Sequence, residues 1–139
     1  MLKRIVSTGV VAAGLLALMA PAALADTPTR DYEVGRQFGN VHRATLTQNP
    51  DGSGYQIRVY GSSPCTATRT DRDNVVGVVS PGWNDAISRV YDYNSCDTKL
   101  YWNGGANTGD TQTGWIDGGS AGVYVGSTWN DRASSYALS

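Results

Sequence analysis

The stretch that decides the fold is Trp83-Asn84-Asp85-Ala86-Ile87-Ser88, which returns as Trp129-Asn130-Asp131-Arg132-Ala133-Ser134. Asn84 and Asn130 are 46 positions apart, and a short apolar run (residues 75–79 and 123–125) precedes each copy. A repeat of this length indicates a domain built twice from one supersecondary unit. Asn, Asp and Ser also offer the oxygen ligands that Ca²⁺ prefers, so the repeat marks a candidate binding site.

The first 25 residues have the pattern of a secretory signal peptide. Lys3 and Arg4 precede an apolar stretch, residues 5–19, and Ala23-Leu24-Ala25 has the small-x-small form of a cleavage site. The apolar stretch is shorter than the roughly 20 residues that a membrane span needs, which argues against a transmembrane anchor. We therefore expect a secreted, extracellular chain that begins at Asp26 and does not associate with membranes.

The charge of the expected mature chain is small and scattered. Without Lys3 and Arg4 it has nine basic and twelve acidic residues, a net charge of about −3. A nucleic-acid-binding surface would need clustered Lys and Arg, and the sequence has no basic run. We expect a single domain that acts as a monomer and does not bind nucleic acid.

Two cysteines, Cys65 and Cys96, remain in the expected mature chain. In an oxidising compartment two cysteines are expected to form a structural disulfide. The alternative, a reactive thiol pair, lacks the usual Cys-x-x-Cys spacing.

The remaining pattern is that of short β-strands. In residues 55–60, Tyr55, Ile57 and Val59 alternate with polar residues, as on a half-buried strand. Residues 43–48 precede this run across a turn that contains Asp51-Gly52, which predicts a hairpin. Further short runs at residues 66–70, 75–79, 88–93, 98–102, 111–116, 122–125 and 134–138 predict an all-β sandwich or barrel.

At the repeated loops the sequence resembles the βγ-crystallin domains, whose calcium signature is Asn/Asp-Asn/Asp-x-x-Ser/Thr-Ser. Residues 130–135 match all six positions, and residues 84–89 match five, with Arg89 in the last. The resemblance implies a βγ-crystallin-type sandwich of two Greek-key motifs over residues 55–139, with Greek key 1 at 55–93 and Greek key 2 at 96–139. Residues 26–54 would then form an N-terminal arm or an edge strand.

The resemblance also implies calcium ligands, with Asp85 and Ser88 in one site and Asp131 and Ser134 in the other. Each site would be completed by the first hairpin of the other unit, and Arg89 would place a fixed cation beside the first loop. The metal-free alternative is that these loops only bond their own backbone, with Trp83 and Trp129 as core residues. The full set of implied ligands is Asn84, Asp85, Ser88, Asn130, Asp131, Ser134 and Ser135.

The Trp-Asn-Asp motif of this small secreted chain also resembles the peptidase inhibitor family that includes the Streptomyces metalloproteinase inhibitor. An extracellular protease is then the expected partner, and residues 61–65 and 103–110 are candidate contact loops. The alternatives are a calcium-stabilised structural or cell-surface module and a secreted antimicrobial toxin. The only histidine, His42, has no metal-ligand spacing around it, and no nucleophile motif is present, so we do not expect an enzyme.

Overall fold

The computed structural model describes residues 25–77 and 79–139, so nearly all of the predicted signal peptide lies outside the described residues. Within them, no helix has the length and apolar character needed to cross a membrane. The elements are β1 Tyr32–Val34, η1 Arg36–Phe38 (a 3-10 turn), β2 Val41–Thr47, β3 Gln56–Gly61, β4 Asn74–Val76, β5 Arg89–Asp92, β6 Thr98–Tyr101, β7 Val123–Tyr124 and β8 Ser135–Leu138.

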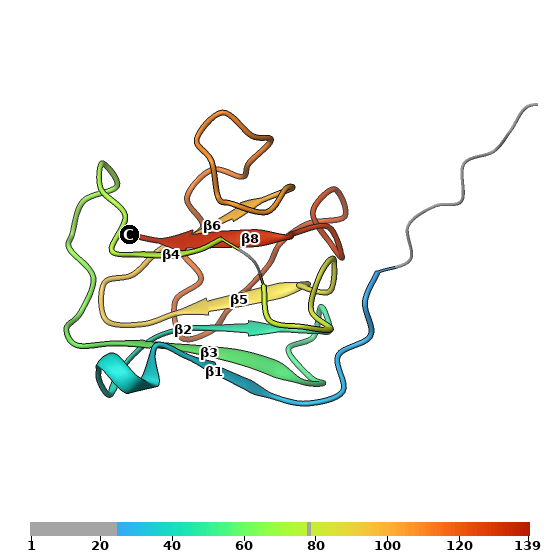
Figure 1. Cartoon of the computed structure of the whole chain (residues 1–139), viewed down its shortest axis with the longest axis horizontal. Coiled ribbons are helices and arrows are strands. Elements are labelled where there is room, and N and C mark those ends of the chain that lie inside the picture. The colour runs from blue at the N-terminus through green and yellow to red at the C-terminus, as the bar shows by residue number, and fades with distance from the viewer. Residues whose placement is uncertain (1–24, 78) are drawn as a thin grey trace, which may run out of the picture.

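Two sheets form the domain. One has the strand order β1-β3-β2-β5-β7 and the other the order β4-β8-β6 (Figure 1). β4 follows β3 in the chain but pairs with β8, while β7 follows β6 but pairs with β5. With residues 111–116, which bridge to β6, counted as the second strand of key 2, each Greek key contributes its third strand to the sheet of the other key. The predicted all-β sandwich of two Greek-key motifs is confirmed.

The first Greek key includes β2, which lies in the segment expected to be an arm or an edge strand. β2 pairs with β3 on one side and with β5 on the other, so it is an interior strand. A strand at this position buries both its edges, and Ala44 and Leu46 are fully buried. β1 is the edge strand, in parallel register with β3. The first key therefore begins near Val41 rather than at residue 55.

Two expected strands are not continuous strands. Residues 66–70 form an exposed loop, in which the Asp71 carboxylate accepts hydrogen bonds from the hydroxyls of Thr66 and Thr68. Residues 111–116 run beside β6 without a continuous ladder: they form isolated bridges, Thr98 with Ile116 and Tyr101 with Gln112, and Thr113 donates to the Leu100 carbonyl at 3.0 Å. Alternating side chains predict strand propensity, but strand formation also requires a neighbouring edge along the whole run.

The core lies between the two sheets and contains residues of both keys, among them Leu46, Ile57, Val90, Leu100 and Tyr136. Trp83 is fully buried, as expected of a core residue. Its counterpart Trp129 is only partly buried and packs against the edge of the core.

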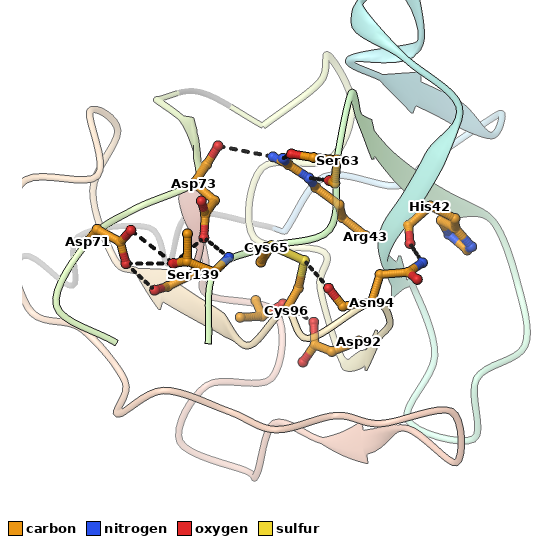
Figure 2. The surroundings of a disulfide bond; sticks show 12 residues. His42, Arg43, Ser63, Cys65, Asp71, Asp73, Asp92, Asn94, Cys96 and Ser139 are labelled. Carbon is orange, nitrogen blue, oxygen red and sulfur yellow. Dashed lines mark hydrogen bonds between the residues drawn. A yellow bond between two sulfur atoms is a disulfide. The ribbon is translucent and has the colours of Figure 1, made fainter. Parts of the chain in front are cut away.

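The predicted disulfide between Cys65 and Cys96 is confirmed (Figure 2). It joins the segment between β3 and β4 to the turn between β5 and β6. The backbone N–H of Cys65 also donates to the carbonyl of Asn94 at 3.0 Å. The bridge therefore links the two Greek keys near their junction.

Candidate metal centre

The two repeated loops bond directly to each other through their backbones. The N–H of Asp85 donates to the carbonyl of Ala133 at 3.1 Å, and the N–H of Asp131 donates to the carbonyl of Ile87 at 3.2 Å. These bonds are equivalent under the internal repeat, so each loop completes the other. Asp85 and Asp131 both have a φ of 56°, a left-handed conformation that Asp tolerates better than most residues.

Each fifth-position serine of the motif continues this exchange. The N–H of Ser88 donates to Thr47 of its own key, and its carbonyl accepts from Val125 of the other key. Likewise, the N–H of Ser134 donates to the Tyr101 carbonyl of its own key, and the Ser134 carbonyl accepts from the N–H of Val79 of the other key. Hydrogen bonds to both keys therefore fix the backbone of each serine, immediately before β5 for Ser88 and immediately before β8 for Ser134.

Three oxygens converge at Ser88. Its hydroxyl donates to the carbonyl of Gln48 at 2.6 Å and lies 3.2 Å from Oδ1 of Asp131. Asn130 donates from Nδ2 to the other Asp131 oxygen at 2.5 Å. Among the described residues, Oδ1 of Asn130 is one of the few buried side-chain oxygens without a hydrogen-bond partner. A buried oxygen without a donor is costly unless a ligand reaches it, and this set of oxygens fits a hard cation.

The second centre is similar but less complete. Asn84 donates to the Asp85 carboxylate at 3.0 Å, and the Ser134 hydroxyl lies near that carboxylate. Burial raises the pKa of the Asp85 carboxyl, and the nearby charge of Asp26 raises it further, against these hydrogen bonds. The centre therefore concentrates negative charge, which a bound cation would neutralise.

The pairing of side chains differs from the expected one. The expectation joined Asp85 with Ser88 and Asp131 with Ser134, within each loop. In the structure Asp131 meets Ser88, and Asp85 meets Ser134. The reason is the exchange of the third strands, which carries each Asn-Asp pair to the Ser of the other key.

The sixth motif position points away from these centres, because neighbouring residues of a strand face opposite sides. Ser135 donates to the carbonyl of Asn103 and accepts from the N–H of Ala106. Arg89 instead donates to the carbonyl of Pro50 at 3.1 Å, and to carbonyls at residues 121 and 122. Both side chains thus bond the first hairpin loop of their own key. Arg89 therefore occupies the position equivalent to Ser135, whose role is structural, and its presence does not remove a member of the oxygen cluster.

Two groups at the centres could not be assigned from the sequence. Gln48 contributes a backbone carbonyl, which any residue type would supply. Asp26 exchanges two hydrogen bonds with Asn84: its N–H donates to the Asn84 carbonyl at 2.9 Å, and its carboxylate accepts from the Asn84 N–H at 3.2 Å. The N-terminal segment that contains Asp26 matches neither copy of the repeat, so no sequence pattern predicted that Asp26 would lie beside Asn84.

His42 has a packing role, at a distance in sequence from both loops. Its ring stacks between Tyr60 and Tyr93, with centroids 5.1 and 4.5 Å away. Burial lowers the pKa of its imidazole, and Nε2 lies 2.9 Å from the Thr45 hydroxyl. The described part of the chain contains no group of three or more His, Cys, Asp or Glu side chains that could hold a metal. A cation site in either centre would therefore combine a single carboxylate with hydroxyl, amide and carbonyl oxygens.

No protein-family model matches this chain, and no curated protein matches it in sequence. Among solved structures, it is similar to a double mutant of a βγ-crystallin domain from Clostridium beijerinckii, with a TM-score of 0.46 and 13% sequence identity. The similarity covers 69% of this chain and 94% of that domain.

Proposed function

We propose that this chain is a secreted, non-enzymatic module that binds calcium at two centres formed jointly by its repeated loops. The observation that carries the proposal is the convergence of Ser88 Oγ, Gln48 O and Asp131 Oδ1, next to the unpartnered Oδ1 of Asn130. Calcium takes six to eight oxygens and accepts mixed sets of carboxylate, hydroxyl, carbonyl and water ligands. Waters would complete each centre.

The internal repeat supports two centres of unequal surroundings. The Asp131–Ser88 centre lies beside the first hairpin, while the Asp85–Ser134 centre lies beside the arm and Asp26. Because each centre draws on both keys, a bound cation would stabilise the junction between them. Calcium binding is therefore expected to raise the stability of the whole domain.

Thermal unfolding in EDTA and in millimolar calcium tests the proposal, with magnesium at the same concentration as the control. Ligand at about 100 times its dissociation constant adds roughly 2.7 kcal/mol of stability. We expect a clear rise in Tm with calcium and a smaller one with magnesium, which tolerates irregular oxygen sets poorly. Equal Tm values in all three buffers would identify the loops as metal-free structural ties.

We propose peptidase inhibition as a second candidate function, supported by how two exposed loops are held. Residues 62–64 are exposed and adjoin the disulfide, and the Ser63 carbonyl accepts from the buried Arg43 at 2.9 Å. In the loop at 103–110, Ser135 bonds to Asn103 and Ala106, which leaves residues 107–109 exposed. A loop held in this way loses little entropy on binding a protease.

A panel of purified secreted metalloproteases and serine proteases, assayed with micromolar protein, tests this second candidate. Inhibition of one class, lost when residues 62–64 or 107–109 are replaced by glycine and serine, would support it. Full activity of every protease would remove it and leave the calcium proposal unaffected.

A further inference from the structure

A hollow of about 680 Å³ is lined by residues of the η1 turn and of the edge strand β4. Its lining includes Val34, Phe38, Arg43, Arg72, Val75 and Val76. The volume is in the range of small-molecule binding pockets. None of the candidate metal ligands lines it.

A buried guanidinium is part of this lining. Arg43 is only 7% exposed, and its Nε and Nη1 donate to the carbonyls of Ser63 and Asp73 (Figure 2). Neither bond is to an anion, and no described carboxylate forms an ion pair with Arg43. The Asp73 carboxylate accepts instead from Thr66, at its backbone N–H and its hydroxyl. Buried arginines are ordinarily paired with an anion, so this positive charge lacks its usual partner.

Arg72 adds a second positive charge to the lining. It donates to the carbonyl of Ala106 at 2.6 Å and also has no carboxylate partner in the described part of the chain. A guanidinium has five N–H donors, and these hydrogen bonds to carbonyls leave donors free on both arginines. Planar guanidinium groups bind carboxylates with charge-assisted hydrogen bonds.

The rest of the lining is apolar and accessible. Phe38 is 73% exposed and Val75 is 44% exposed, whereas Val34 and Val76 pack against the core. Phe38 is the most exposed of the large hydrophobic side chains in the described residues. The lining therefore combines two guanidinium groups with an apolar surface.

We propose that this hollow binds the C-terminal apolar residue of a peptide, with its carboxylate at Arg43 and Arg72 and its side chain against Phe38 and Val75. β4 is the outer strand of its sheet, so its free edge is available for backbone hydrogen bonds to the peptide. A carboxylate ligand would supply the anion that the two arginines lack. An apolar side chain would cover the exposed phenyl ring.

The test uses N-acetyl-phenylalanine as the probe and N-acetyl-phenylalaninamide as a matched control without the carboxylate, both titrated into the wild-type chain by NMR. We expect the probe to shift the backbone amide signals of residues 38, 72 and 75. The amide control should bind with an affinity at least about tenfold lower. Acetate, which lacks the apolar body, should bind more weakly than the probe. Equal binding of probe and amide control, or no shifts at about 10 mM probe, would overturn the proposal.

Variants test the location. Phe38→Ala and Arg72→Gln change exposed side chains and should each weaken probe binding several-fold with little change in Tm, whereas Tyr55→Ala, at another exposed aromatic, should not. Arg43→Lys retains the charge but loses the planar donor pair, so it should also weaken binding; its Tm is measured alongside. Unchanged affinity in both Phe38→Ala and Arg72→Gln would place the probe elsewhere and refute the assignment.

Discussion

The Asp131 carboxylate lies 3.2 Å from the Ser88 hydroxyl, although 43 residues separate them in the chain. The equivalent contact joins Asp85 to Ser134. The two candidate centres are thus shared between the Greek keys, and neither key alone contains a complete one. Folding of both keys is therefore a condition for cation binding at either centre.

Asp131→Asn should reduce the response to calcium. The substitution keeps the shape of the side chain but removes the charge at the oxygen cluster, which lowers affinity for a divalent cation. We expect the calcium-induced rise in Tm to shrink and equilibrium dialysis to show one site fewer. Asp117→Asn, at an exposed aspartate outside both loops, is the matched control and should behave like wild type.

A double-mutant cycle tests the crossed pairing. Ser88→Ala and Asp131→Asn remove two members of one centre, so their effects on calcium affinity should be strongly non-additive. Ser88→Ala combined with Asp85→Asn affects two different centres, and those effects should come closer to adding. The reverse result would restore the within-loop pairing that the sequence suggested.

Loss of the disulfide in a Cys65→Ser/Cys96→Ser double variant should destabilise the domain by about 3–4 kcal/mol, because the bridge closes a loop with a sequence separation of 31. Urea unfolding of oxidised wild type and of the double variant measures the difference. Calcium binding should survive in the folded variant, since the hydrogen bonds of the two cysteines in the described structure go to Tyr93 and Asn94 and not to the repeated loops. Unchanged stability would show that the bridge is dispensable.

The two tryptophans of the repeat should differ in their contribution to stability. Trp83 is fully buried, and its indole N–H donates to the Arg30 carbonyl at 3.4 Å. Trp129 is partly buried, with its ring 6.0 Å from that of the exposed Trp102. Trp83→Ala should cost about 3–5 kcal/mol, and Trp129→Ala clearly less. Chemical denaturation of the two variants makes the comparison, and equal losses would contradict it.

Stability should also depend on pH through the buried Asp92. Its carboxylate accepts from the Thr98 hydroxyl at 2.5 Å and from the Gly118 N–H at 2.8 Å, yet burial raises its pKa from 3.8 to about 6. The folded state therefore holds this proton more tightly than the unfolded state. The stabilisation from Asp92 is greatest below pH 3.8, falls as the pH rises toward about 6, and is absent above that.

Asp92→Asn removes this titration and can still bond to both neighbours, because its amide can donate to the Thr98 hydroxyl and its carbonyl can accept from Gly118. The stability of wild type relative to the variant should therefore decline between pH 3.8 and about 6, by something on the order of 2 kcal/mol. Guanidinium unfolding of both proteins across this range measures it. Parallel stability curves would show that folding leaves the pKa of Asp92 unchanged.

Several features followed from the sequence because they depend on neighbouring residues. Alternation in residues 55–60 predicted β3, and two cysteines in the expected mature chain left one intramolecular pairing. The repeated Trp-Asn-Asp pattern marked the loops that the structure brings together. Periodicity along one strand is encoded by its own side chains, so a single sequence is enough to find it.

The sequence alone therefore determined the class of fold, the twofold repeat, the bridge and the residue types of the candidate centres. Only the tertiary structure decided that Asp131 meets Ser88, that β2 is an interior strand, and that Arg43 is buried without an anion. These features depend on which strands become neighbours after the third strands exchange sheets. Which strands become neighbours is set by the long-range packing of both keys around one core, and the alternation of side chains along one strand does not encode it.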